Sequence, residues 1–175
     1  MRKGLIPLIL VIGAALLVSP PGLAGQAKDS RKPAARLDRY QVPAGTALLL
    51  KLRTPLDSSK VSVDDQVEAT LWSPVVQDGV ELIPVGSVAI GKVLEVKRAT
   101  ERVPAGSVAF AFSIVEHAET GSRAMLTTRK VLVEAPPQDE ASRGKQKPKP
   151  TQATMSEGAA FVAMTAEPLV VRIPR

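Results

Sequence analysis

Three copies of one five-residue element, each directly before an apolar run, constrain the fold of this chain more than any other feature. The element reads apolar, proline, small, glycine, hydroxyl, and its copies are Val42–Thr46, Ile83–Ser87 and Val103–Ser107. Proline fixes φ near about −65° at a corner, and glycine two residues later accepts a positive φ. Each copy therefore predicts a turn that leads into a strand. The residues expected to build these turns are Pro43, Gly45, Pro84, Gly86, Pro104 and Gly106.

Between the turns, apolar residues recur with a period of two, and no stretch from Leu37 onward has a helical period. In 87–98 one parity is held by Val88, Ile90, Leu94 and Val96. Such alternation is typical of half-buried strands. We expect strands at 46–54, 66–73, 80–83, 87–98, 107–117, 123–134, 158–165 and 168–173. Short strands separated by turns predict an all-β fold, as a small single-domain β-barrel or sandwich.

A second repeat relates the two ends of this domain. Gly45-Thr46-Ala47 is followed by Pro55, and Gly158-Ala159-Ala160 is followed by Pro168, with the same glycine-to-proline spacing. Two similar strands at opposite ends of a chain can pair with each other. We therefore expect the strands that follow Gly45 and Gly158 to pair and close a barrel.

The N-terminal segment has the order of a secretory signal. Basic residues at positions 2 and 3 precede an uncharged run from Leu5 to Val18, and small residues follow around Ala24. The run is shorter than the about 20 residues that span a bilayer. We expect residues 1–24 to be a Sec-type signal peptide, 25–36 a flexible leader and 37–175 one domain, located in the periplasm or cell envelope.

This interpretation makes a direct prediction about processing. The mature protein should begin between Gly25 and Lys28, because the apolar run ends early at Pro20-Pro21 and small residues follow it. Mass spectrometry of the exported protein measures its N-terminus. An intact Met1 in the membrane fraction would contradict the prediction and indicate an anchored subunit.

Composition excludes several kinds of chemistry. Hydrophobic residues make up 45% of the chain and charged residues 23%, which indicates a folded protein. The absence of cysteine excludes disulfide frameworks, cysteine nucleophiles and cysteine-based metal sites. The single histidine, His117, excludes a multi-histidine metal site. Glu116 and Glu119 are its candidate partners for a metal or for acid–base work, but a solvated, charged turn is the interpretation we favour.

Two further pairs of polar residues lack the sequence context of a catalytic or metal site. Asp64-Asp65 is not part of a D-x-D-x-D-G loop, so we expect a turn in which the aspartates bond the local backbone. Ser58-Ser59 has no G-x-S-x-G frame. We therefore expect no enzyme activity, no catalytic residues, no metal and no cofactor.

Residues 136–157 form a polar segment between two apolar stretches. A cluster of bases lies within it: Arg143, Lys145, Lys147 and Lys149. We expect an exposed loop whose replacement from Pro137 to Glu157 by a short Gly/Ser turn leaves the fold intact, because loop-closure entropy changes slowly with length. The clustered bases favour contact with an anionic envelope polymer or lipid headgroups. Nucleic acid is not expected, because the chain is exported and no aromatic residues are interleaved to stack bases.

Residues 42–93 carry a series of short elements in a fixed order. The elements are Val42–Thr46, Leu56-Asp57-Ser58, Asp65–Ala69, Leu82–Ser87 and Gly91-Lys92-Val93. Together they resemble the TrbI-like β-barrel domain of outer core-complex proteins of type IV secretion and conjugation machines. Small exported proteins of unknown function carry similar stretches, and the chain is most similar to these. The resemblance implies a β-barrel located in the cell envelope.

The chain departs from the pattern of that family in three places. Asp64-Asp65 stands where the family has Pro-Gly. The machine subunits keep an uncleaved cytoplasmic and transmembrane N-terminus, whereas this chain begins with a signal-like segment. They also insert an apolar helical segment late in the barrel, whereas Pro136–Glu157 is too polar to enter lipid. We therefore expect no membrane span once the chain is processed.

The function expected from these features is structural. We expect an exported assembly module of the cell envelope that binds partner proteins through its barrel surface and sheet edges. The alternative is a small binder of an anionic polymer or glycan through the loop Arg143–Lys149. Loss of retention on an anionic matrix when the loop is deleted distinguishes the second function from the first.

Overall fold

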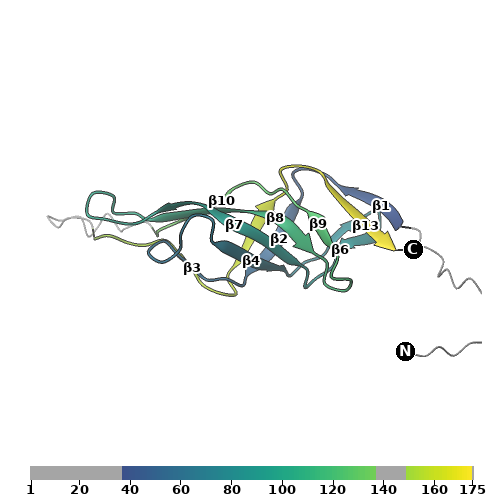
Figure 1. The fold of residues 1–175 in the computed structure, drawn as a ribbon, viewed down its shortest axis with the longest axis horizontal. Coiled ribbons are helices and arrows are strands. Elements are labelled where there is room, and N and C mark those ends of the chain that lie inside the picture. The colour runs from purple at the N-terminus through teal and green to yellow at the C-terminus, as the bar shows by residue number, and fades with distance from the viewer. Residues whose placement is uncertain (1–36, 137–148, 175) are drawn as a thin grey trace, which may run out of the picture. The chain divides into compact units, whose positions relative to one another are not determined.

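The computed structural model describes residues 37–136 and 149–174, and this part of the chain consists of strands joined by turns and connecting segments (Figure 1). The strands are β1 (Leu37–Val42), β2 (Ala47–Leu52), β3 (Leu56–Asp57), β4 (Gln66–Leu71), β5 (Val75–Gln77), β6 (Val80–Ile83), β7 (Val88–Lys97), β8 (Ser107–Glu116), β9 (Arg123–Met125), β10 (Val131–Glu134), β11 (Thr154–Met155), β12 (Ala160–Met164) and β13 (Leu169–Pro174). The prediction of an all-β fold is confirmed. In the described ranges, no helix has the length and hydropathy needed to cross a bilayer.

One antiparallel sheet forms most of the described domain. Its order is β10-β8-β7-β4-β2-β12, and β9 also pairs with β8. The two ends of this order meet at an antiparallel bridge between Thr128 and Thr165. Next to the bridge, the Arg129 N–H donates to the Met164 carbonyl at 2.8 Å, and the Ala166 N–H donates to the Thr127 carbonyl at 2.7 Å. The sheet thus curls until the segment before β10 meets the end of β12, which gives it the shape of a partly closed barrel.

The repeat seen at the two ends of the domain corresponds to a pair of neighbouring strands. β2 pairs with β12, with Ala47 opposite Met164. The Gly45 N–H donates to the Thr165 carbonyl at 2.8 Å, and the Gly158 N–H donates to the Leu52 carbonyl at 2.7 Å. Each turn is therefore bonded to the far end of the other strand, as a local two-fold relation requires. The expected pairing of these two strands is confirmed.

Aromatic rings fill part of the barrel interior and decide which face of β7 is buried. The rings of Phe110 and Phe112 pack edge to face with centroids 5.7 Å apart. On the neighbouring β7 the buried residues are the small or short ones, Ala89, Gly91 and Val93. The sequence pattern predicts that the side chains of Val88, Ile90, Leu94 and Val96 face the core, and this is wrong. Leu94 is 46% exposed, and the other three are only half-buried. Large rings on one strand leave room only for small side chains on the next.

The first two copies of the proline–glycine element form turns of the same kind. Gly45 has a φ of 81° and lies just before β2, and Gly86 has a φ of 87° and lies just before β7. The Ser87 N–H donates to the Pro84 carbonyl at 3.2 Å, so proline occupies the first position of the turn and not a corner. In the other copy, the Thr46 hydroxyl donates to the Pro43 carbonyl at 2.7 Å. Glycine at the second corner supplies the left-handed conformation that the turn requires.

The third copy does not form this turn, which corrects the expectation for Pro104 and Gly106. Gly106 is absent from the residues with positive φ in the described chain. Instead, the adjacent Ala105 forms a parallel bridge with Thr151. A Cβ atom at Gly106 would lie 2.6 Å from the Ser58 hydroxyl oxygen and 3.1 Å from the Ala153 nitrogen. Close packing, and not backbone conformation, therefore accounts for glycine at this position.

We predict that Gly45→Val and Gly86→Val each lower the free energy of unfolding by more than about 1 kcal/mol, because a β-branched residue is strained at positive φ. Urea denaturation followed by circular dichroism measures the change. Ala44→Val, at an exposed residue of the same turn with ordinary φ, is the control. If Gly45→Val lowers the free energy of unfolding no more than Ala44→Val does, strain at positive φ is not the cause of the effect.

Candidate functional site

The polar segment 136–157 that follows β10 is not a loop over its whole length, as the sequence suggests it is. Of its four clustered bases, Arg143, Lys145 and Lys147 lie outside the described residues, and Lys149 is exposed. The segment from Thr151 onward belongs to the fold: the Thr151 N–H donates to the Pro104 carbonyl at 2.8 Å, and β11 pairs with β3. The expectation that all of 136–157 is an excursion from the sheet is therefore wrong for its last third. The anionic-polymer alternative stays a prediction of the sequence.

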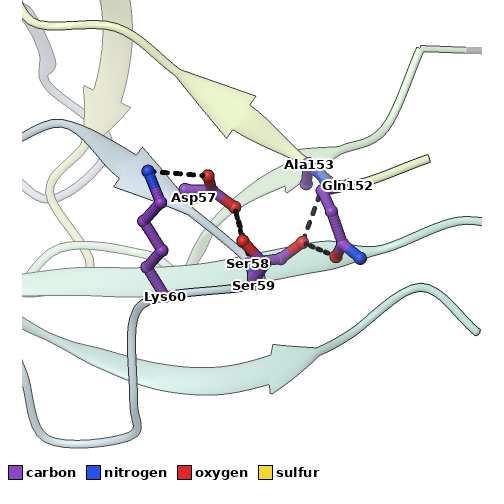
Figure 2. A network of polar contacts seen from close by, with 6 residues as sticks. All are labelled: Asp57, Ser58, Ser59, Lys60, Gln152 and Ala153. Carbon is purple, nitrogen blue, oxygen red and sulfur yellow. Dashed lines mark hydrogen bonds and ion pairs between the residues drawn. The ribbon is translucent and has the colours of Figure 1, made fainter.

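A buried polar network anchors this returning segment (Figure 2). The Ser58 side chain is fully buried, and its hydroxyl donates to Gln152 Oε1 at 2.7 Å and accepts the Ala153 N–H at 3.0 Å. The Ser58 N–H donates to the Ala153 carbonyl at 2.9 Å. Gln152 Oε1 also accepts the Ala99 N–H at 3.0 Å. The Ser58 hydroxyl and N–H thus hold the returning segment against the start of the turn after β3.

Next to Ser58, an aspartate caps its own turn. Asp57 Oδ1 accepts the Ser59 hydroxyl at 2.6 Å and the Ser59 N–H at 2.8 Å. Lys60 Nζ lies 3.7 Å from Asp57 Oδ2. The hydrogen bond from the Ser59 hydroxyl, followed by that from its N–H and by the charge of Lys60, lowers the pKa of Asp57. These contacts, which Figure 2 shows, lie within one turn and stabilise it.

We predict that Ser59→Ala raises the pKa of Asp57 toward its ordinary value, because the strongest hydrogen bond to the carboxylate is lost. The pKa of Asp57 is lower in the folded chain than in the unfolded chain. The ionised carboxylate of Asp57 therefore stabilises the folded chain above the unfolded pKa, and this stabilisation is lost as the pH falls through the folded pKa. Carboxyl chemical shifts in an NMR titration measure this pKa. Thr120→Ala, at another exposed turn, is the control, and an unchanged Asp57 titration in Ser59→Ala would contradict the assignment.

The aspartate pair at 64–65 also forms a turn. Asp65 Oδ2 accepts the Ser62 N–H at 2.7 Å, as the sequence interpretation expects. Asp64 has a φ of 71°, a conformation that aspartate tolerates better than most residues. Its Oδ1 lies 3.4 Å from Lys92 Nζ. Across the described ranges, no group of three or more histidine, cysteine, aspartate and glutamate residues is placed to hold a metal ion.

The structure separates His117 from its candidate carboxylate partners. Its Nδ1 accepts the N–H of Glu119 at 3.3 Å, which is a backbone contact within the turn. Glu116 Oε2 instead accepts a bond from Arg123 Nε at 2.8 Å. His117 thus lies in a turn, with backbone bonding and no carboxylate contact among the described residues.

A groove that the sequence analysis did not identify lies among β6, β8, β9 and β13, beside His117. Its volume is about 690 Å³. Most of its lining is apolar and includes Leu82, Val115, Ala124, Met125 and Val170. Met125 is 80% exposed and Val170 is 51% exposed. We refer to this feature as the β9–β13 groove.

The groove exists because β13 leaves the barrel edge. The last bond along that edge joins the Ala166 N–H to the Thr127 carbonyl. Pro168 has no N–H with which to continue the ladder, and from Leu169 the chain pairs with β1 instead. Figure 1 shows β13 running beside β1 and leading away from the barrel strands. Proline at 168 was visible in the sequence, but the partner of the strand that follows it was not.

Solved structures of other proteins share features of this fold. No family model and no curated protein matches the chain. The chain is similar to ComB10 of the Com type IV secretion system of Helicobacter pylori, with a TM-score of 0.52 and 15% sequence identity. The similarity covers 77% of this chain and 92% of that one. The chain therefore shares its β fold with a component of a type IV secretion system.

Proposed function

We propose that the protein is an exported module of the cell envelope that assembles with partner proteins through a TrbI-like barrel. The observation that carries this proposal is the fold shared with ComB10 over 77% of the chain. The ordered elements in 42–93 resemble the TrbI-like β-barrel domain and add a sequence argument to the proposal. The signal-like segment at 1–24 supports export.

We propose further that the role is one of assembly and not of catalysis. The polar residues with catalytic potential in the sequence are engaged locally: Ser58 in the buried network, Glu116 with Arg123, and His117 in its own turn. The β9–β13 groove offers apolar side chains at the surface, and contiguous exposed apolar surface is typical of binding sites.

Cross-linking in intact cells, followed by purification of the protein, tests this function. We expect adducts with envelope proteins, among them components related to type IV secretion machines. A Ser59→Ala variant, altered at an exposed turn, should form the same adducts. The proposal would be contradicted if the protein is exported but forms no adducts, under conditions in which a known envelope complex is captured.

A further inference from the structure

The β9–β13 groove has an open strand edge along one side. β9 pairs with β8, and this ladder is flanked by bonds from the His117 N–H to the Ser122 carbonyl at 2.8 Å and from the Leu126 N–H to the Ser113 carbonyl at 2.9 Å. Peptide groups of successive residues in a strand point to opposite edges. The N–H and C=O groups of Arg123 and Met125 therefore point away from β8. An extended peptide can bond to such an edge.

On the other side of the groove, the two-stranded ribbon of β1 and β13 carries unbalanced positive charge. Arg172 of β13 lines the groove and lies directly opposite Arg39 of β1, and both side chains are exposed. In contrast to Arg123, which Glu116 neutralises, neither arginine forms an ion pair with another described residue. Like charges directly opposite each other on neighbouring strands are destabilising. A carboxylate placed between them would relieve this repulsion.

Resting on the proposed assembly function, we propose that the β9–β13 groove binds an extended segment of a partner protein that carries both apolar side chains and carboxylates. The apolar side chains pack on Met125 and Val170, and the carboxylates meet Arg39 and Arg172. The backbone of the segment bonds to the open edge of β9. This arrangement covers apolar surface and neutralises the arginine pair at the same time.

Binding of two matched peptides to the purified full chain tests the proposal. One fluorescein-labelled peptide alternates valine with glutamate, and the other alternates valine with lysine. We expect fluorescence polarisation to detect binding of the glutamate peptide alone, weakening as salt is raised because exposed charges are screened. Amide NMR shifts should map the contact to Arg123, Met125 and Val170.

Charge reversal separates recognition from folding. Arg39→Glu removes one positive charge and places a carboxylate opposite Arg172, which should keep or raise the stability of the ribbon. We nevertheless expect it to weaken binding of the glutamate peptide about tenfold or more. Met125→Ser should also weaken binding. The matched controls are Arg98→Glu, an exposed base outside the groove, and Leu94→Ser on β7, and both should bind as the unaltered chain does.

Several outcomes would overturn the proposal. These are equal binding of both peptides, binding of neither, shifts that map away from β9 and β13, or no difference between Arg39→Glu and Arg98→Glu. Failure here is distinct from failure of the assembly function. If Arg39→Glu and Met125→Ser leave the cross-linked envelope adducts unchanged, the groove is not the docking site, and the proposed assembly takes place on another surface.

Discussion

A chain in which a short Gly/Ser turn replaces residues 137–148 should fold with nearly unchanged stability, whereas the same turn in place of 137–157 should prevent folding or severely destabilise it. The shorter replacement lies between the described Pro136 and Lys149 and leaves β10, β11 and the Ser58 network in place. Its effect on closure entropy is small, about 0.6 kcal/mol per doubling of length. The two replacements therefore differ in nine residues that the sequence alone assigned to the loop.

The longer replacement removes contacts of buried groups. It deletes β11 with its pairing to β3, and it deletes Gln152 and Ala153, which bond Ser58. The Ser58 N–H and hydroxyl lose these partners, and removal of the segment that covers them exposes them to water. Each hydrogen bond lost in this way costs about 0.5–1.5 kcal/mol. The buried Ala153 and the partly buried Met155, which packs against the core, are deleted as well. Together these losses are a large part of the about 5–15 kcal/mol by which domains are stable.

Urea denaturation followed by circular dichroism compares the two replacements. Gln152→Ala in the full chain is the intermediate case, since it removes the side chain that bonds Ser58 and leaves β11 in place. We expect its stability to lie between those of the two replacements. Equal stability of the two replacements would show that 149–157 contributes nothing to the fold. Unfolding by the shorter replacement would place an integral element within 137–148.

The second large effect is expected at Gly91, where Gly91→Ala should lower the free energy of unfolding by about 3 kcal/mol or more. Gly91 lies opposite Phe112 at a register shift between β7 and β8. A Cβ atom there would overlap the Ala111 carbonyl oxygen and lie 2.7 Å from both the Ala111 carbonyl carbon and the Phe112 Cα. These are backbone atoms, so the clash is relieved only by separating two central strands of the sheet.

Gly45→Ala is the matched control for this prediction. A Cβ atom at Gly45 meets nothing within 4 Å, so its cost comes from positive φ alone, about 1–2 kcal/mol. Thermal and urea unfolding of both variants measure the difference. If Gly91→Ala is no more destabilising than Gly45→Ala, the two strands do not approach as closely at Gly91 as the structure shows.

Features of the fold that depend on neighbouring residues could be predicted from the sequence. Apolar runs and their alternation with a period of two reflect the strand backbone, so seven strands lie where the sequence predicts them: β2, β4, β6, β7, β8, β12 and β13. The turns at Gly45 and Gly86 depend on the local conformational freedom of glycine. The repeat around Gly45 and Gly158 even identified the two strands that pair across the domain.

Features that depend on residues distant in the sequence could be seen only in the folded chain. The short strands β3 and β11 exist because they pair with each other, and two-residue strands carry no readable period. The small residues of β7 face the core because the rings of β8 fill the space beside them. Glycine is required at 106 because Ser58 packs closely against it, and not because a turn needs a positive φ there. The β9–β13 groove results from β13 pairing with β1 instead of following the barrel edge. Burial and strand partners are set by all the segments that meet in space, and a local pattern contains no record of them.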